Sequence, residues 1–357
     1  MSLADLALPF VKRLNPETAH KLTIKGLKSG IGLPKVNPSQ WATPVKLPMA
    51  GLRLPNPVGL AAGFDKNADV FRQMARFGFG FVECGTVTPR PQPGNAKPRL
   101  FRLPEDGAVI NRMGFNNAGL LHFTRQLKHA GDCPVPVGAN VGANKHTLDM
   151  IEDYQIGIRE VFPYADYITI NISSPNTPRL RGLQDKTALE ELLIRCGDTA
   201  TSFENDKPVF LKLAPDLDET GIAGIIDTVR GAGHWLTGLI ISNTTTSRPA
   251  DLQGRYRTEK GGLSGAPLMA LSTRVLKQFA EELHGDFDLI GSGGVSSGAD
   301  AYAKIRAGAH AVQLYTALSY QGAGLVARIN AELAECLKAD GFTSVAEAVG
   351  ADLSSSH

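Results

Sequence analysis

Short apolar runs alternate with helical patterns from residue 57 onward, and this alternation restricts the folds that the chain can adopt. Each apolar run has the β-branched content of a buried strand, and each intervening segment carries apolar residues at helical spacing. Strict alternation predicts a parallel sheet, because neighbouring parallel strands are joined by crossover helices. The expected strands are Val58–Ala62, Phe79–Thr86, Val135–Asn140, Tyr167–Asn171, Val209–Leu213, Leu236–Ser242, Leu289–Ser292 and Ala311–Tyr315. The expected helices are Lys66–Arg76, Ala118–Ala130, Thr147–Phe162, Thr187–Asn205, Glu219–Ala232, Leu268–His284, Ser297–Ala307 and Gly324–Lys338.

The number of strands and helices predicts a particular α/β architecture. Eight of each favour a closed (β/α)8 TIM barrel over a doubly wound open sheet. The 357 residues suffice for one such domain with an appendage. Val45–Leu47 and Leu52–Leu54 flank a turn at Pro48–Gly51, so we expect a small hairpin that plugs the barrel floor.

The N-terminus differs from the rest of the chain, and we assign residues 1–38 to a two-helix extension and residues 39–357 to the barrel. Asn15 is a plausible N-cap for a second helix that starts at Pro16 and ends at Gly30. Residues 1–46 hold seven basic and two acidic groups, whereas the rest of the chain is net acidic. This unit is either an amphipathic hairpin docked on an anionic membrane surface or a hairpin packed on its own barrel. The stripe of the first helix consists of Leu3, Leu6, Ala7, Phe10, Val11 and Leu14.

Composition excludes several classes of protein. The net charge of +2 gives no reason to expect a nucleic-acid partner. The four cysteines form no CxxC pair, which fits a reducing compartment and argues against a zinc site. No apolar run approaches the ~18 residues of a membrane span. Asp5 interrupts the only candidate signal-peptide core, so we expect no secretory signal.

Three strand-to-helix segments are longer than usual and predict where a site lies. They are roughly Val87–Asn117, Ile172–Lys186 and Asn243–Pro267, and they follow the second, fourth and sixth strands. All three therefore open at the carboxyl end of the barrel, where active sites of this architecture are built.

The segment Asn171–Leu180 follows a buried strand and is rich in neutral polar groups. Two amides and three hydroxyls occur before the first charge, and two prolines stiffen the turn. This pattern suits the binding of a flat, hydrogen-bonding ligand. The alternative is a turn that satisfies its own backbone.

Two further features point to a bound anion and a ring. Lys212 lies inside an apolar strand, where it needs an anion, many acceptors or a salt-bridge partner within the barrel. Gly291–Gly294 ends the seventh strand, at a place where these barrels frequently bind phosphate through backbone N–H groups. A phosphate there and a ring beside Lys212 describe flavin mononucleotide (FMN). Lys66 stands at the rim, as a ligand contact or as a solvated lysine.

Taken together, the motifs resemble those of dihydroorotate dehydrogenases, specifically the membrane-associated, quinone-linked class 2. The resemblance runs from about residue 8 to residue 335 and rests on several motifs in order. They are Pro16–His20, Gly59–Lys66, Phe101–Asp106, Asn111–Asn117, Asn171–Thr177, Gly261–Gly265 and Gly291–Gly294. Ser242 stands where many class 2 relatives have threonine, and Arg181-Gly182 departs from the bacterial lid sequence.

The resemblance implies residue roles. Ser174 is the expected catalytic base, and no metal ligand is expected. The quinone tunnel is expected to be lined by His20, Arg102 and Tyr315. FMN contacts are expected from Ala62, Gly63, Phe64, Asp65, Lys66, Thr86, Asn140, Asn171, Lys212, Ser242, Gly265, Gly294, Tyr315 and Thr316. Contacts with dihydroorotate or orotate are expected from Lys66, Asn111, Arg112, Met113, Gly114, Phe115, Asn171, Asn176, Asn243 and Thr244.

The implied activity is oxidation of (S)-dihydroorotate to orotate, with FMN as hydride acceptor and a membrane quinone, ubiquinone or menaquinone, as final acceptor. It belongs to de novo pyrimidine biosynthesis, on the cytoplasmic face of the bacterial inner membrane. Residues 1–38 are expected to serve the quinone step and to be dispensable for the chemistry on dihydroorotate. Three alternatives are another FMN barrel oxidoreductase, a flavin-free phosphate-sugar enzyme, and a membrane-docking protein with an inactive barrel.

Overall fold

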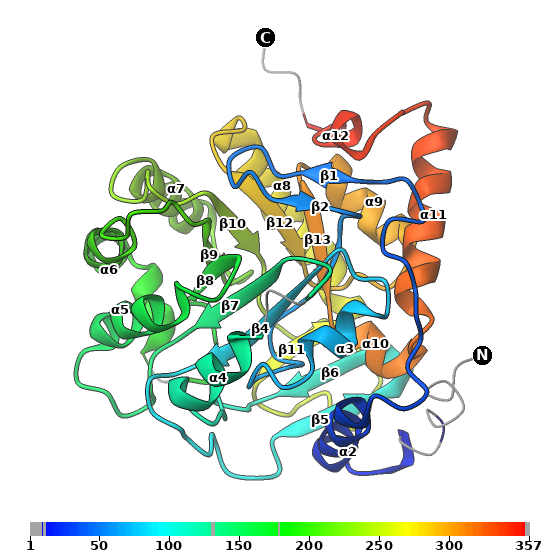
Figure 1. The fold of residues 1–357 in the computed structure, drawn as a ribbon, viewed down its shortest axis with the longest axis horizontal. Helices are drawn as coiled ribbons and strands as arrows, with labels where there is room; N and C mark the ends of the chain where they lie inside the picture. The colour runs from blue at the N-terminus through cyan, green and yellow to red at the C-terminus, as the bar shows by residue number, and fades with distance from the viewer. Residues whose placement is uncertain (1–8, 10–11, 130–132, 178, 354–357) are drawn as a thin grey trace.

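The computed structural model describes residue 9 and residues 12–129, 133–177 and 179–353, and its centre is a closed barrel of parallel strands. The strand order around the barrel is β10-β12-β13-β3-β4-β7-β8-β9, and β9 pairs with β10 to close it (Figure 1). The predicted eight-stranded barrel is confirmed. The strands are β3 (Val58–Leu60), β4 (Phe81–Val87), β7 (Val137–Val141), β8 (Tyr167–Asn171), β9 (Val209–Leu213), β10 (Gly238–Ile241), β12 (Asp288–Ser292) and β13 (Ala311–Leu314).

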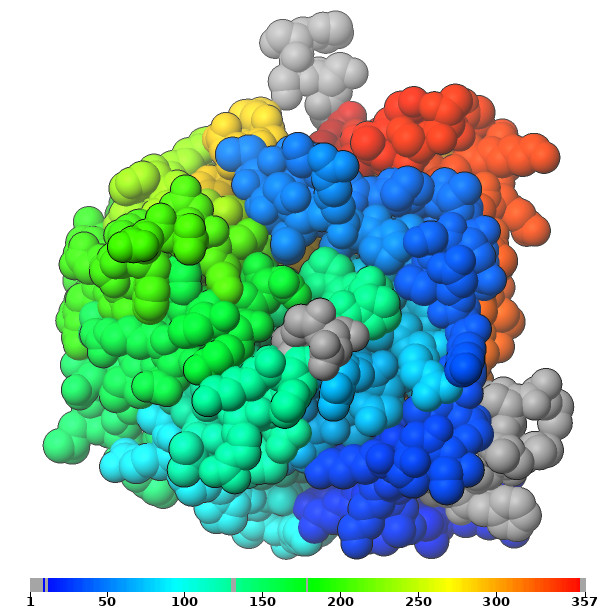
Figure 2. All heavy atoms as spheres, viewed as in Figure 1, coloured from blue at the N-terminus to red at the C-terminus, as the bar shows by residue number. Residues whose placement is uncertain are grey.

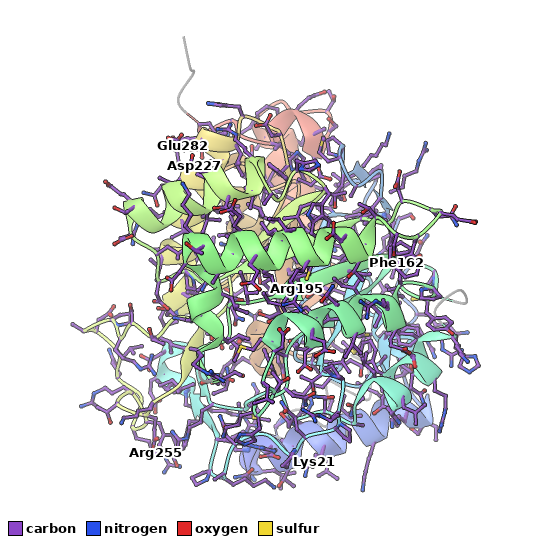
Figure 3. All side chains as sticks on the ribbon, turned by 90° about the vertical axis from the view of Figure 1, so that its left-hand side faces the viewer. Lys21, Phe162, Arg195, Asp227, Arg255 and Glu282 are labelled. Atoms are coloured by element: carbon purple, nitrogen blue, oxygen red, sulfur yellow. The ribbon has the colours of Figure 1, made fainter. Side chains whose placement is uncertain are left out.

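Helices cover the outside of the barrel, and every expected helix between strands is present. Figure 3 shows α5, α6 and α7 side by side on one flank, with Phe162, Arg195 and Asp227 labelled along them. The helices of the ring are α3 (Phe71–Ala75), α4 (Leu120–Leu127), α5 (Met150–Val161), α6 (Lys186–Ala200), α7 (Glu219–Arg230), α8 (Met269–Leu283), α9 (Gly298–Arg306) and α11 (Leu325–Ala339). Shorter elements are η1 (Pro104–Asp106), η3 (Leu180–Gln184), η4 (Ala266–Leu268), α10 (Thr316–Gln321) and α12 (Val345–Ala348).

Side-chain caps fix where several of these helices begin. The carboxylate of Asp149 accepts hydrogen bonds from two first-turn N–H groups of α5, and the hydroxyl of Ser297 accepts one from the N–H of Asp300 in α9. α3 is shorter than expected because its predicted first turn does not become helical. Ala68 there has a φ of 57°, and the buried Asp65 carboxylate binds the N–H groups of Asp69 and Val70 at 2.7 Å.

A hairpin occupies the floor of the barrel, as the sequence predicts. It consists of β1 (Val45–Lys46) and β2 (Arg53–Leu54), and its turn residue Ala50 donates its N–H to Asp288 at 2.7 Å. Since Asp288 begins β12, the hairpin lies at the amino ends of the strands, opposite the predicted site.

A three-stranded antiparallel sheet, which we call the roof, was not expected from the sequence. It consists of β5 (Leu100–Leu103), β6 (Ala108–Asn111) and β11 (Gly262–Gly265), in the order β11-β6-β5. The first two strands come from the long segment after β4, and β11 comes from the segment after β10. The roof therefore joins two of the three long segments into one body at the carboxyl end of the barrel.

The described part of the N-terminal extension contains α2 (Pro16–Ser29), which packs beside β5 of the roof (Figure 1). The Asn15 side chain accepts from the first-turn N–H groups, and Gly30 ends the helix with a φ of 70°, so both predicted ends are confirmed. Figure 2 shows α2 in dark blue at the lower edge, beside the cyan segment that contains β5. The stripe expected in the first helix falls mainly on residues 1–8 and 10–11, outside the described residues.

Candidate functional site

A cavity of about 740 Å³ lies at the carboxyl ends of the barrel strands, under the roof and against α2. Strand ends, the long loops and the N-terminal helix all contribute to its wall. Most of the residues selected from the sequence line this one space, which we call the central cavity. They are His20, Ala62, Gly63, Phe64, Lys66, Thr86, Arg102, Asn111, Met113, Gly114, Phe115, Asn171, Ser174, Asn176, Lys212, Ser242, Asn243, Thr244, Gly265, Gly294, Tyr315 and Thr316.

Three selected residues do not line the cavity themselves. Asp65 is buried and caps the turn before α3, as described above. Asn140 is buried and bonds to Thr86 at 2.6 Å, so it orients a residue that does line the cavity. Arg112 turns away and forms an ion pair with Glu259 at 2.7 Å. These three residues support the wall through their neighbours.

The asparagines of the different loops are joined by hydrogen bonds. The Asn171 amide donates to the Thr86 hydroxyl at 2.9 Å, and its oxygen accepts from Ser173 at 2.8 Å. Asn243 in turn donates to the Ser173 hydroxyl at 2.9 Å. The amides at the ends of β8 and β10 therefore hold each other in fixed orientations, which is the preorganisation that a specific polar ligand needs.

Ser174 presents its hydroxyl to the central cavity while being almost fully buried. Its Oγ accepts a hydrogen bond from the N–H of Asn176 at 3.3 Å. Nearby in sequence, the buried Thr177 hydroxyl oxygen has no hydrogen-bond partner among the described residues. A buried hydroxyl without a partner is uncommon, and it leaves Thr177 able to accept or pass on a proton.

Lys212 lines the central cavity and also has an ionic partner inside the barrel. Its side chain is 6% exposed, and its Nζ lies 3.9 Å from a carboxylate oxygen of Glu83. Burial lowers the pKa of Lys212, and the negative charge of Glu83 opposes that shift. The sequence left two interpretations of Lys212, a ligand contact and a salt bridge. The observed position of Lys212 allows both at once.

Glu83 is a site residue that the sequence analysis missed. It lies in the middle of β4 with no exposed surface, and it accepts hydrogen bonds from side chains of three other barrel strands, β7, β8 and β13. The donors are Asn140 at 2.8 Å, Gln313 at 2.8 Å, Thr169 at 3.1 Å and Tyr167 at 3.3 Å. A single acidic residue inside the apolar run Phe81–Val87 was the signal that could have identified it.

Two basic residues at the cavity rim have strongly altered pKa values. Burial lowers the pKa of Lys66 to about 8, and its ammonium donates to the carbonyl of Gly63. Burial, followed by repulsion from Lys66, lowers the pKa of His20 to about 3, so its imidazole is neutral. The His20 ring packs edge-on against Phe64, with ring centroids 5.5 Å apart.

Comparison with known proteins identifies the family. Residues 45–337 match the family model described as dihydroorotate dehydrogenase. The chain belongs to the dihydroorotate dehydrogenase family.

Curated relatives place the chain in the quinone-linked class of the family. It is 50% identical to the dihydroorotate dehydrogenase (quinone) of Azorhizobium caulinodans, over 99% of this chain and 100% of the relative. It is 51% identical to that of Cereibacter sphaeroides strain KD131, over 98% and 97% of the two chains. A crystal structure of the Eimeria tenella enzyme in complex with ferulenol superposes with a TM-score of 0.91 at 36% identity, covering 98% and 99%. The resemblance noted in the sequence is confirmed.

In this member of the dihydroorotate dehydrogenase family, one arm of the central cavity is apolar and runs along α2. Leu22, Leu27 and Ile31 line it, and the side chains of Leu22 and Ile31 are 48% and 78% exposed. Arg102 of β5 closes the arm from the roof and donates to the carbonyl of Leu14 at 2.9 Å. Phe10, from the predicted stripe of the first helix, lies outside the described residues.

The opposite end of the cavity is built from glycines and hydroxyls. Gly265 and Gly293 have φ angles of 99° and 104°, which favour glycine. A Cβ at Gly294 would lie 2.4 Å from the Cα of Met269, so this position excludes any side chain. Thr316 donates to the Ser264 hydroxyl at 2.9 Å beside these glycines. Such a cradle of backbone and hydroxyl groups suits a phosphate.

Arg181 of η3 links two loops of the site. Its guanidinium donates to the carbonyls of Ser173 at 3.1 Å and Thr244 at 2.9 Å, and to Asp216 at 2.8 Å. It therefore ties the loop after β8 to the loop after β10, behind the asparagines.

The described residues contain neither a candidate membrane span nor a candidate metal cluster. Within that part of the chain, no helix has the length and apolar character needed to cross a bilayer. No group of three or more His, Cys, Asp or Glu side chains there is arranged to hold a metal ion.

Proposed function

We propose that the chain oxidises (S)-dihydroorotate to orotate in de novo pyrimidine biosynthesis, with FMN as hydride acceptor and a membrane quinone as final electron acceptor. Family membership supports the overall reaction. One observation carries the proposal: a single cavity is lined by four distinct features. They are the glycine cradle, the buried Lys212, the amide cluster with Ser174, and the apolar arm.

The donor set of the cavity fits FMN. The cradle of Gly265, Gly294 and Thr316 matches a phosphate, and Lys212 and Thr86 offer a cation and a hydroxyl where a ring would need partners. The volume of about 740 Å³ is within the range of cofactor sites. When bound, FMN supplies the hydride acceptor and passes the electrons to the quinone. We propose the cofactor-binding residues selected from the sequence as its contacts.

Dihydroorotate carries a carboxylate and ring amides, and the amide cluster offers complementary groups. Lys66 is the proposed partner of the carboxylate, and Asn111, Asn171, Asn176 and Asn243 are the proposed partners of the ring amides. A site whose buried amides are left unpaired by an incorrect ligand discriminates strongly against it.

Ser174 is proposed to remove the proton from the substrate carbon next to the carboxyl-bearing carbon. An ordinary serine is a weak base, so its hydroxyl proton must leave as it accepts the new one. The unpartnered Thr177 hydroxyl supports a route for that proton toward water. The buried surroundings exclude competing solvent.

The quinone is proposed to enter along α2 and to reach His20, Arg102 and Tyr315. Neutral His20 and cationic Arg102 are able to donate hydrogen bonds to quinone oxygens, and exposed Leu22 and Ile31 suit contact with lipid. We therefore propose residues 1–38 as the quinone and membrane unit and residues 39–357 as the FMN barrel. The proposed location is peripheral, on the cytoplasmic face of the bacterial inner membrane.

Anaerobic mixing with dihydroorotate tests cofactor and substrate together. We expect the purified protein to be yellow and its visible flavin band to bleach on mixing. A colourless protein would favour a flavin-free barrel enzyme, and a yellow protein that does not bleach would favour another FMN oxidoreductase.

Replacing Lys212 with methionine should weaken FMN binding and lower the reduction potential of the flavin. Methionine keeps most of the buried volume and removes the positive charge beside the proposed ring site. Spectroelectrochemical titration measures the potential, and equilibrium dialysis measures FMN affinity. An unchanged potential together with a lower melting temperature would mean that Lys212 serves only its ion pair with Glu83.

Orotate affinity should fall as the pH rises above about 8, because the ammonium of Lys66 is the proposed carboxylate partner. The charged form binds the anion, so affinity is expected to be level below this pH and to drop about tenfold per pH unit above it. Titration of orotate between pH 6 and 10 measures the effect. Lys66→Met provides the control, since any pH dependence that it retains belongs to the ligand; an equal slope in both proteins would rule out the assignment.

A further inference from the structure

A buried ion pair links the N-terminal helix to the base of the roof. Glu17, in the first turn of α2, accepts two hydrogen bonds from the guanidinium of Arg99, at 2.8 and 3.1 Å. The Arg99 side chain is only 7% exposed and that of Glu17 only 10%. The hydrogen bonds and charge of Arg99 lower the pKa of Glu17, so the pair is ionised at neutral pH. Two parallel bonds between planar groups fix orientation as well as distance.

The remaining guanidinium nitrogen of Arg99 fixes a turn that precedes β5. Its NH1 donates to the carbonyls of Pro93 at 2.6 Å and Asn95 at 2.8 Å. Gly94 between them has a φ of 76°, and a Cβ there would lie 2.8 Å from the same NH1. The guanidinium therefore fits tightly against this turn, and its position depends on the carboxylate that holds its other edge.

The turn then holds both loops that carry the substrate asparagines. The side-chain amide of Asn95 donates to the carbonyl of Arg112 at 3.1 Å and to the carbonyl of Asn176 at 3.0 Å. Lys145 fixes the orientation of that amide by donating to its oxygen at 2.9 Å. Across the same junction the Asn176 side chain donates to Asn111 at 3.3 Å. Asn95 thus sets the distance between two groups proposed to contact the substrate.

We propose that Glu17, Arg99 and Asn95 are positioning residues for dihydroorotate. Through these three residues, α2 of the proposed quinone unit keeps the substrate asparagines at the correct distance from each other. This inference rests on the proposed function, since it concerns the same substrate site. None of the three side chains needs to contact the substrate. Their effect is expected on substrate affinity, whereas the limiting rate of flavin reduction depends on Ser174.

Glu17→Gln in the full-length, FMN-loaded protein tests the link. The neutral amide of glutamine keeps the shape of the Glu17 side chain but weakens its hydrogen bonds with Arg99. We therefore expect the orotate dissociation constant to rise about fivefold or more. FMN content and the reduction rate at saturating dihydroorotate should stay within about twofold. Orotate binding is measured from the shift of the flavin spectrum, in the absence of quinone, so the neighbouring quinone arm does not enter the measurement.

Lys28→Gln is the matched control. Lys28 also tethers α2 to the barrel through an ion pair, with Asp69 at 3.0 Å, but this pair does not lead to the Asn95 turn. Orotate affinity should therefore change less than about twofold in Lys28→Gln. Equal effects of the two substitutions would overturn the proposal, because they would reflect general loosening of α2.

A double-mutant cycle tests the path itself. Asn95→Ala should weaken orotate binding, and adding Glu17→Gln should have little further effect, because both changes release the same junction. Fully additive effects would contradict the path. If Glu17→Gln does not retain FMN, Arg99→Lys is used in its place. Lysine keeps the buried positive charge but cannot form the paired hydrogen bonds of the guanidinium to Glu17. Normal orotate binding by Arg99→Lys would overturn the proposal. Failure of the parent protein to bind orotate would instead refute the proposed function.

Discussion

Ser174→Ala is expected to slow the reduction of flavin by dihydroorotate at least ~100-fold, while FMN and orotate remain bound. Removing a general base typically costs about 10²–10⁴ in rate. The Ser174 hydroxyl accepts from the N–H of Asn176 but faces the central cavity, so its loss changes the wall little. Stopped-flow bleaching of the flavin at saturating dihydroorotate, without quinone, measures the chemical step directly.

Ser173→Ala is the control for this substitution. The neighbouring Ser173 hydroxyl is fully buried and bonds only within the amide cluster, to Asn171 and Asn243. Its removal should weaken substrate binding more than it slows the saturated rate. Near-normal reduction in Ser174→Ala, or an equal loss of saturated rate in both variants, would show that Ser174 is not the base.

Deletion of residues 1–38 is expected to lower turnover with a long-chain quinone about 100-fold or more. Dihydroorotate at saturating concentration should still reduce the flavin. The deletion removes His20 and the apolar arm beside Leu22 and Leu27 and leaves every proposed FMN contact in place. Loss of the proposed quinone-binding segment removes several apolar contacts, each worth about 1 kcal/mol or more. Association with vesicles that contain anionic phospholipid should also fall. In the parent protein we expect this association to weaken as salt is added.

The same deletion also removes Glu17, the carboxylate partner of Arg99, so a loss of stability has to be separated from a loss of the quinone step. A water-soluble electron acceptor, used in parallel, reports whether electrons still leave the flavin. Long-chain quinone turnover equal to that of the full chain would show that residues 1–38 do not serve the quinone step.

The barrel could be predicted because its determinants are local. β8 and β9 begin and end at the predicted residues, since each is a continuous apolar run between helical patterns. The start of α3 could not be predicted, because the Asp65 carboxylate takes up backbone N–H groups that a helix would otherwise use. The roof could not be predicted either. Ser264 of β11 bonds to Val109 of β6, 155 residues away, and the glycine-rich β11 has little strand propensity of its own.

The site was predictable to the extent that it lies at strand ends. Ser174, Lys212 and Gly294 line the same cavity because the carboxyl ends of parallel strands meet at one end of a barrel. The supporting residues were not predictable. Asn95 donates to the backbone carbonyl of Asn176 in another loop, and Arg99 donates to the side chain of Glu17 in α2. No spacing in the sequence indicates that these partners will be near.

The carboxylate of Glu83 has a consequence for how the barrel assembles. Its partners are side chains of β7, β8, β9 and β13, and the last of them, Gln313, is 230 residues further along the chain. A partly assembled barrel, or one with a strand shifted in register, would bury this negative charge with some donors missing, which costs free energy for each bond not made. All of them are satisfied only when β7, β8, β9 and β13 are in place around β4. The buried Glu83 carboxylate therefore disfavours barrels in which these strands are missing or misaligned, and it favours the arrangement in which the active-site strand ends meet.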